Sequence, residues 1–406
     1  MRRRDLTVRL GDCLPPEHLA CFVVDSVALL DLSALYARYG SRGGEPYAPE
    51  VLLALLLYGY ATGVFSSRKT ERATYESVPF RYSAGNRHPD HDTSAAFRRT
   101  FLPELKALFV QVLLLAQEAG VLTLGTISLD GTTIHADASK SKAVSYNEIA
   151  RREDRLARLA AAKAVLEERA QERATLEQAA YAETMAQRAE QERATGQRPR
   201  GRAPTPPVLG PRAKDQYNFT DPTSRIMKNP TDQGFEQDYT VQSAVEQGSL
   251  LIVGASLSNQ PNDSHEAEPT LATIPPEVGT PDAAALDQGY GGAATLEACA
   301  VRDIEPYSAT GREPHHQSWQ ERFAPEPDPP PDDARPQVRM AYKLKTAVGT
   351  SIYGARKYTV EPVLGIITEV RGFRQFSLRG EATAAGAWLL VCLAFNLKRF
   401  HTLSPV

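Results

Sequence analysis

The chain has 406 residues, of which 42% are hydrophobic and 23% are charged, as in a soluble globular protein of two or three domains. Its four cysteines are scattered, which excludes a disulfide scaffold and a cysteine zinc site and favours a reducing cytoplasm. No apolar run reaches the ~20 residues of a membrane-spanning helix, and no secretion signal is predicted. We therefore expect a cytoplasmic protein that does not bind a membrane.

The formal net charge of −3 is unusual for a nucleic-acid binder, because phosphate contacts usually come with an excess of Lys and Arg. The charges are unevenly distributed, however. Acidic residues gather around Glu326 to Asp333, whereas Lys and Arg gather from Arg339 to Arg379. The local sign of the charge is therefore more informative than the total.

Residues 1–122 are predicted to form an all-helical N-terminal DNA-binding domain. Pro49 suits the first turn of an apolar helix that Gly63 ends. Asp92-Thr93 is predicted to cap a basic helix, and a longer apolar helix is predicted from Leu105 to Ala119. Short helices with a glycine turn are typical of a helix-turn-helix module. The cations expected on its exposed face are Arg68, Lys69, Arg98 and Arg99. A plain helical bundle with a basic surface is the alternative.

Residues 123–145 are predicted to begin a catalytic sheet, because the hydrophobic period changes here from helical to alternating. Thr126 to Asp130 is predicted to form a strand, Gly131-Thr132 a tight turn, and Thr133 to Ala136 the returning strand. Asp130 is thereby expected at the end of a strand.

Residues 146–212 are predicted to be a helical insertion followed by a proline-rich linker. From Tyr146 to Thr195 the chain is rich in Ala, Glu, Arg and Gln, with apolar residues near helical spacing. This pattern indicates one long solvated helix or two, which could pair as a coiled-coil hairpin. Gly196 to Pro211 is predicted to be a flexible basic linker.

Residues 213–400 are predicted to be the rest of an α/β core, with residues 401–406 as a tail. Strands alternate with helices in this part of the chain, which is typical of a sheet with flanking helices. The predicted strands are Gly234 to Val245, Leu250 to Ala255 and Ala283 to Leu286. The apolar run from Trp388 to Phe395 is predicted to be a core helix.

Three acidic residues are candidates for binding divalent metal ions. Mg²⁺ prefers oxygen ligands, and two ions ~3.5–4 Å apart can activate the attacking oxygen and stabilise the leaving oxygen of a phosphodiester. Asp130 and Asp287 each follow a predicted strand, and ligands bind beyond strand ends in open sheets. Glu361 shares a helical stretch with Tyr353, Arg356 and Lys357. Pro362 predicts that this helix either kinks or has its main part begin there.

Spacing alone leaves other assignments open. An Asp after a strand is more often a turn or cap residue than a metal ligand. His88 and His91, with the acids beside them, are better explained by a loop and a helix cap than by a metal site. Rival acids for the metal site are Asp137, Asp263, Glu369 and Glu381.

Motifs over nearly the whole chain resemble the DDE transposases of bacterial insertion sequences, specifically the IS1182-like group of the IS4 and IS5-related class. In the N-terminal part the similar segments are Leu32 to Tyr39, Pro46-Tyr47, Leu52 to Ser67, Glu71 to Glu76 and His88 to Thr93. In the rest of the chain they are Ser128 to Thr132, Ala138 to Lys140, Asn218 to Pro222, Ser224 to Lys228, Asp287 to Tyr290 and Val360 to Gly380.

The resemblance implies an RNase H-like catalytic core, a mixed sheet with flanking helices, preceded by the all-helical domain and interrupted by the insertion. It also implies two Mg²⁺ or Mn²⁺ ions, with Asp130, Asp287 and Glu361 as the catalytic metal ligands. Tyr353 and Arg356 match the residues that precede the glutamate in the family's basic signature. Thr368 stands where that signature has a lysine. The DNA-binding residues expected in this region are Tyr353, Arg356, Lys357, Arg371 and Arg374.

The resemblance further implies cleavage of transposon ends and joining of the freed 3′-OH ends to target DNA. The expected partners are double-stranded DNA and further copies of the chain, in a homodimer or a larger synaptic complex. Two alternatives stay open. One is a decayed or domesticated DNA-binding protein of the same fold, which Thr368 favours, and the other is a non-transposing RNase H-like nuclease.

Overall fold

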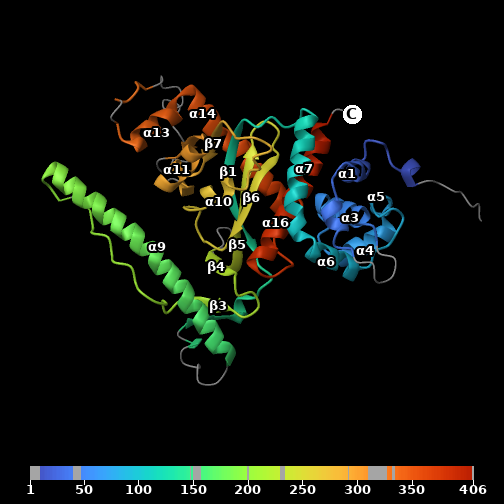
Figure 1. Ribbon diagram of the computed structural model, residues 1–406, viewed down its shortest axis with the longest axis horizontal. Helices are drawn as coiled ribbons and strands as arrows, with labels where there is room; N and C mark the ends of the chain where they lie inside the picture. The colour runs from blue at the N-terminus through green and yellow to red at the C-terminus, as the bar shows by residue number, and fades with distance from the viewer. Residues whose placement is uncertain are drawn as a thin grey trace, which may run out of the picture. The chain divides into compact units, whose positions relative to one another are not determined.

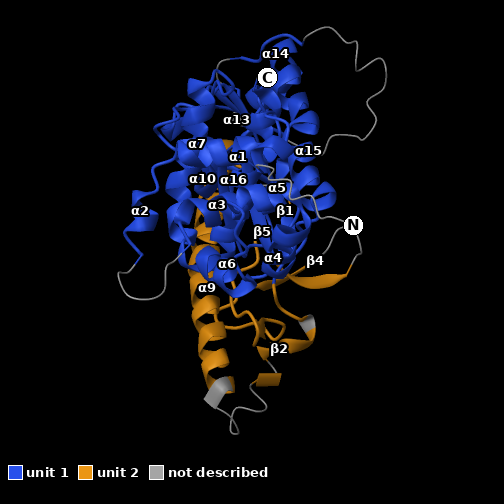
Figure 2. Cartoon of the chain, turned by 90° about the vertical axis from the view of Figure 1, so that its right-hand side faces the viewer, with its two compact units in different colours: residues 1–136, 239–406 blue, residues 137–238 orange. Residues whose placement is uncertain are grey.

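The computed structural model describes residues 10–39, 47–146, 148–149, 157–198, 201–228, 234–290, 292–309, 327–331 and 334–404. The chain forms two compact units (Figure 2). The larger unit comprises residues 1–136 and 239–406, and the smaller unit comprises residues 137–238. The N-terminal helical region therefore shares a unit with residues 239–406.

The described part of the N-terminal region is helical, as predicted. Pro49 begins its helix, and Gly63 follows the end of that helix with a φ of 83°. The basic helix is capped by Asp90, whose side chain accepts from the Thr93 backbone N–H, and not by Asp92-Thr93 as predicted. The helices are α1 (Leu19–Ala28), α2 (Ser33–Tyr36), α3 (Pro49–Ala61), α4 (Ser67–Glu76), α5 (Val78–Ser83), α6 (His91–Thr100) and α7 (Leu105–Glu118).

A mixed six-stranded sheet forms the centre of the fold and confirms the predicted α/β class (Figure 1). Its strands are β1 (Thr126–His135), β4 (Arg225–Lys228), β5 (Phe235–Glu246), β6 (Ile252–Ser258), β7 (Ala283–Leu286) and β8 (Glu305–Ser308). The order is β4-β5-β1-β7-β8, and β6 pairs with β5. β1 pairs with β7, and β7 with β8, in parallel, whereas β6 and β4 run antiparallel to β5.

The predicted hairpin at Gly131-Thr132 is wrong. β1 continues without a turn from Thr126 to His135, so Asp130 lies in the middle of a strand and not at its end. Gly131 has a different reason for being glycine. A Cβ atom at this position would lie 2.5 Å from the side-chain amide of Gln242 on β5, and glycine in a strand often marks such a close approach.

A long C-terminal helix, α16 (Glu381–Leu403), is the predicted core helix and extends into the expected tail. It packs against β6, α3 and α7, and so holds the helical region and the sheet in one unit (Figure 1). Trp388 on this helix is buried and donates to the Gln242 backbone carbonyl over 3.2 Å. Asn396 is also buried, and it pairs with both backbone polar groups of Ile252 at the edge of β6.

Shorter helices connect the strands and lead to α16. α10 (Ala267–Leu271) lies between β6 and β7, and a 3₁₀ turn (Gln288–Tyr290) and α11 (Ala293–Val301) lie between β7 and β8. After β8 follow α13 (Pro336–Lys345), α14 (Ala347–Gly354), a 3₁₀ turn (Ala355–Tyr358), α15 (Val360–Gly365) and a π-helical turn (Ile366–Val370).

The smaller unit contains the long helix α9 (Ala157–Thr195), and the described residues Tyr146, Glu148 and Ile149 before it are also helical. β2 (Ala143–Ser145) and β3 (Gln216–Asn218) pair antiparallel beside it. A small core is made of Ile149, Leu159, Ala162 and Leu166, with Val144, Tyr146, Tyr217 and Phe219 packed against it. The described residues between Gly196 and Pro211 form no helix or strand, and Arg173 holds the end of this segment by contacting Asp215 and the Gly210 carbonyl.

Within the ranges that the structure describes, no single helix is long and apolar enough to cross a membrane. Taken together, α6 and the segment Leu102–Glu118, which meet at a bend of 52°, have the length and the apolar composition of a membrane span. Both parts of this pair bury apolar side chains in the larger unit, among them Phe97, Leu108 and Val112.

Replacing Asn396 with Leu is expected to lower the free energy of unfolding by about 2–5 kcal/mol, because the N–H and C=O of Ile252 each lose a partner in a buried position. Urea denaturation measures the change. Lys398→Leu, at an exposed position of the same helix, is the matched control. Equal stability of the two variants would contradict the role assigned to Asn396.

Candidate functional site

Asp130 and Asp287 become neighbours through the parallel pairing of β1 with β7. Leu129 is paired with Leu286 in this register, and each is followed by an aspartate, Asp130 within β1 and Asp287 directly after β7. Paired residues of adjacent strands point to the same face of a sheet. Two carboxylates separated by more than 150 positions in the sequence are therefore side by side.

Arg356 bridges the two aspartates. Its Nη2 lies 3.1 Å from Asp130 Oδ2, and its Nη1 lies 2.9 Å from Asp287 Oδ1. The Arg356 side chain is only 8% exposed. Nη1 also lies 3.4 Å from the Tyr353 hydroxyl, and the guanidinium carbon lies 5.6 Å from the centre of the Tyr353 ring. The basic signature and the acids thus form one cluster.

The charges of this cluster are not balanced. Burial raises the pKa of Asp130 to about 6, Arg356 and the Gly131 N–H act against this increase, and the charges of Asp287 and Glu361 add to it. Burial also acts to lower the pKa of Arg356, but the surrounding acids raise it above its usual value. The positive charge of one buried arginine is therefore outnumbered by the negative charges of three carboxylates.

Glu361 lies in the first turn of α15, where its side chain is exposed. The preceding 3₁₀ turn, which carries Arg356, ends at Thr359, whose φ of −116° and ψ of −88° interrupt the helix. The break thus lies three residues before Pro362, and the proline falls within the first turn of α15, where its missing N–H costs little. Neither form of the Pro362 prediction is correct in detail.

Thr359 and Ser128 were missed by the sequence analysis, although they fix this break to the sheet. The Thr359 hydroxyl lies 2.9 Å from the Ser128 hydroxyl on β1 and donates to the Ala355 carbonyl over 2.7 Å. Gln247 donates both to Ser128 and to the Ile352 carbonyl, each over 3.0 Å. These bonds hold the segment with Arg356 and Glu361 against the strand that carries Asp130. The sequence signal that could have identified Ser128 is its position two residues before Asp130, which puts both side chains on one face of a strand.

The donor set suits a hard divalent cation, because all three acids offer carboxylate oxygens. In the parts of the chain that are described, however, no group of three His, Cys, Asp or Glu side chains is arranged to hold a metal ion. Arg356 lies between the two aspartates instead. The excess negative charge around Asp130 is the feature that a cation would offset.

The other cations predicted in the C-terminal region differ in their surroundings. Lys357 is exposed. Arg374 is also exposed and pairs with Glu369. Arg371 is partly buried, with its guanidinium carbon 4.9 Å from the centre of the Phe395 ring, and burial lowers its pKa to about 10. Among the described residues, its Nε and Nη1 atoms have no hydrogen-bond partner.

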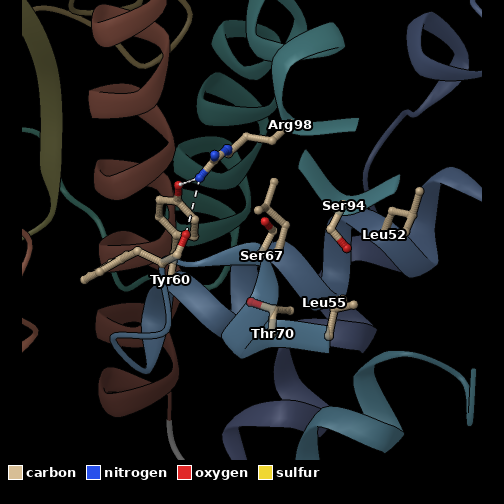
Figure 3. A pocket seen from close by; sticks show the side chains of 9 residues that line it. Leu52, Leu55, Tyr60, Ser67, Thr70, Ser94 and Arg98 are labelled. Atoms are coloured by element: carbon tan, nitrogen blue, oxygen red, sulfur yellow. Dashed lines mark hydrogen bonds between the residues drawn. The ribbon is translucent and has the colours of Figure 1, made fainter. Parts of the chain in front are cut away.

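The four predicted cations of the helical region are also not equivalent. Arg68 and Lys69 on α4 and Arg99 on α6 are exposed. The expectation that Arg98 lies on an exposed face is wrong. Arg98 is buried and donates to the Tyr60 hydroxyl over 2.9 Å and to the Phe65 carbonyl over 3.3 Å. Arg98 lines a cavity of about 20 Å³. Its bond to Tyr60, drawn in Figure 3, links α6 to α3.

The rival acids have other partners. Asp263 accepts from Gln242 over 2.6 Å, and Glu381 accepts from Asn259 over 2.9 Å. Asp137 belongs to the smaller unit. Among the histidine candidates, His91 contacts Glu71 over 2.8 Å, beside the helix cap made by Asp90. The prediction that this histidine segment forms a loop and a helix cap is therefore confirmed, although the capping residue is Asp90 and not Asp92.

Two family models match the chain. The family described as Transposase domain (DUF772) matches residues 8–100, and the Transposase DDE domain matches residues 331–401. An N-terminal part and a C-terminal part of the chain are thus similar to transposase domains. The second of these includes Arg356 and Glu361 of the acidic cluster. No curated protein and no solved structure matches the chain.

Replacing Arg356 with Gln is expected to lower the free energy of unfolding by about 2–4 kcal/mol in metal-free buffer, because Asp130 and Asp287 lose their shared counter-ion. The value is below that of a fully buried pair because about half of the Asp287 side chain is exposed. Chemical denaturation measures it. Lys357→Gln changes an exposed neighbouring cation, and an equal loss in that control would argue against the bridge.

Proposed function

We propose that this protein is a DDE transposase of the bacterial insertion-sequence type. It would bind the ends of its element, cleave the DNA in a reaction that needs two divalent metal ions, and join the 3′-OH ends to target DNA. The observation that carries the proposal is the adjacency of Asp130 and Asp287, which β1 and β7 bring together and Arg356 bridges, with Glu361 adding to the negative charge that acts on Asp130. The matched transposase domains support the same class.

An RNase H-like core is part of this proposal. Its support is a mixed sheet in which the central strand β1 has a parallel neighbour, β7, and one acid stands on or directly after each of these strands. The assignment to the IS1182-like group rests on the sequence motifs. Residues 213–400 would supply the larger part of this core, with residues 146–212 as its insertion.

Asp130, Asp287 and Glu361 would hold two Mg²⁺ or Mn²⁺ ions, which when bound supply activation of the attacking oxygen and charge stabilisation at the leaving oxygen. Before that, Arg356 offsets part of the repulsion between the two aspartates. No side chain needs to act as a nucleophile in this chemistry. The freed 3′-OH attacks the target phosphodiester, so one phosphodiester bond forms as another breaks.

The DNA would be held by cations on both matched domains. Arg68, Lys69 and Arg99 are exposed on the helical region, where a helix-turn-helix function is proposed. In the C-terminal region, Tyr353, Lys357, Arg371 and Arg374 are the proposed phosphate contacts, and Arg356 would release one of its two aspartates to contact DNA. Arg98 is less suited to this role, because its guanidinium is engaged inside the helical region. Thr368 offers a hydroxyl bonded to the Leu364 carbonyl in place of the family lysine.

Asp130→Asn is expected to abolish Mg²⁺-dependent nicking of a duplex that carries the element's end, because one metal ligand is lost while the phosphate contacts remain. Gel-shift binding to the same duplex should change less than about threefold, since the cations that dominate DNA affinity are unaltered. Glu369→Gln, which neutralises an exposed rival acid, is the control and should still cleave. Nicking by purified Asp130→Asn protein would refute the assignment of the acids.

Precut ends separate the proposed transposase from its alternatives. A transposase joins such ends to a target plasmid, whereas a nuclease of the same fold cuts without joining. A DNA-binding protein that has lost activity would bind the ends without cutting them, and Thr368 is the residue that favours this second candidate. Flanking inverted repeats beside the reading frame would also support the transposase.

The smaller unit is a candidate interface for a homodimer or larger synaptic complex. Tyr146 donates its backbone N–H to the Asp215 carbonyl over 2.8 Å, so β2 and β3 can be joined directly. Replacing residues 147–214 with Asn-Gly would close this hairpin and is expected to retain binding of single ends while abolishing paired-end complexes. Native gels with labelled ends measure both.

A second variant guards against misfolding of the shortened protein. Leu176→Glu changes a side chain that is 72% exposed on α9 and should leave the helix intact. Loss of paired-end complexes in both variants is expected. Unaltered paired-end complexes in the shortened protein would rule out the interface.

A further inference from the structure

Gln242 is a fully buried glutamine at the centre of β5, on the strand that lies beside β1. A buried amide must have partners for its N–H and C=O groups, because leaving one unpaired costs free energy. Gln242 has them at both ends. Its Nε2 donates to Asp263 Oδ1 over 2.6 Å, and its Oε1 accepts from the hydroxyl of Tyr290.

These two partners come from the segments around the second aspartate. Tyr290 closes the 3₁₀ turn that begins directly after Asp287, and it is fully buried. Burial raises the pKa of Tyr290, so its hydroxyl stays protonated and donates. Asp263 packs on the same turn, because a Cβ atom at Gly289 would lie 3.3 Å from Asp263 Oδ2. The amide of Gln242 is thus tied to the turn that follows Asp287.

The same amide also lies against the residue after the first aspartate. A Cβ atom at Gly131 would meet the Nε2 and Oε1 atoms of Gln242, both at 2.5 Å. The Gly131 N–H in turn donates to Asp130 Oδ1 over 2.9 Å. On the other side, the Gln242 backbone carbonyl accepts from Trp388 of α16. The Gln242 side chain therefore contacts the chain next to both aspartates, and its backbone carbonyl is bonded to the core helix α16.

We propose that Gln242, clamped between Asp263 and Tyr290, is a positioning residue that fixes the spacing of Asp130 and Asp287 for metal binding. The proposal rests on the proposed metal-dependent function of those acids. Replacing a residue that orients metal ligands without touching the ion typically lowers metal affinity or activity by about 10–100-fold. It also assigns Asp263 as a partner of Gln242 and not as a third metal ligand.

The central test uses Gln242→Leu, which keeps a side chain of similar length but removes both hydrogen bonds. Calorimetric titration of the purified full chain with Mn²⁺ is expected to show a 10–100-fold weaker Kd, and nicking should need a correspondingly higher Mn²⁺ concentration for half-maximal rate. Binding of the end duplex should stay within about twofold, because no phosphate contact changes.

Gln237→Leu is the matched control. Gln237 is a second buried glutamine of β5, and its Oε1 accepts from Ser224 over 2.9 Å, away from the acids. Both variants lose a buried amide, so both should lower the Tm. A merely structural role predicts that they behave alike towards Mn²⁺, and that result would overturn the proposal.

Tyr290→Phe keeps the proposal testable if Gln242→Leu does not fold, because it removes one oxygen atom. We expect an intermediate weakening of Mn²⁺ binding, since Gln242 keeps its bond to Asp263. Mn²⁺ affinity identical to that of the unaltered protein would count against the clamp.

A compensation experiment tests the contact with Gly131. Gly131→Ala is expected to weaken Mn²⁺ binding because the new methyl group displaces the Gln242 amide from its two partners. Adding Gln242→Ser removes the obstructing atoms, so the double variant should bind Mn²⁺ no more weakly than Gln242→Ser alone. Fully additive losses would show that the two residues act independently.

The outcomes separate this proposal from the proposed function. If the unaltered protein neither binds Mn²⁺ nor nicks the end duplex, the metal-dependent function fails. If it does both and Gln242→Leu matches Gln237→Leu, the function stands and the positioning role of Gln242 is refuted.

Discussion

The parallel register between β1 and β7 is the constraint on which the site depends. It places Leu129 opposite Leu286 and thereby brings two aspartates together from distant parts of the chain. A slip of one residue would turn one of the two side chains to the opposite face of the sheet. The register is protected because both strands bury apolar side chains around the acids, Ile127 and Leu129 on one strand and the whole of Ala283–Leu286 on the other.

Adjacent carboxylates repel one another, and burial of Asp130 strengthens that repulsion. Arg356, which lies on a 3₁₀ turn, offsets part of this repulsion, whereas Glu361 lies after the break at Thr359. One short segment thus carries both the cation that bridges the aspartates and a third acid whose charge acts on Asp130 and Arg356. Its geometry is held by the buried bond between Thr359 and Ser128, so the sheet that carries the first aspartate also positions the residues that interact with it.

Local patterns predicted strand segments at β1, β5, β6 and β7 and the apolar helices, because each leaves a period in the sequence. Spacing left the choice of acids open, and the resemblance to the transposases supplied it. Contacts between distant residues could not be predicted in this way. Gly131 was interpreted as a turn residue, yet its lack of a side chain makes room for Gln242, more than 100 positions later. Arg98 was placed on the surface because charge usually is, but Tyr60 and Phe65 satisfy it inside. The Thr359 break was masked by Pro362, the stronger local signal.

The insertion between β2 and β3 is compatible with this site for a physical reason. The smaller unit has its own core around Ile149 and Leu166, and the long helix α9 contributes to that core. Asp130, Asp287 and Glu361 all belong to the larger unit, and the bonds that hold Arg356 and Gln242 are formed there as well. An element with a separate core can lengthen or change its surface without altering the register that pairs the aspartates. The smaller unit is therefore the part of the chain where a partner-binding role could vary at least cost to the acidic site.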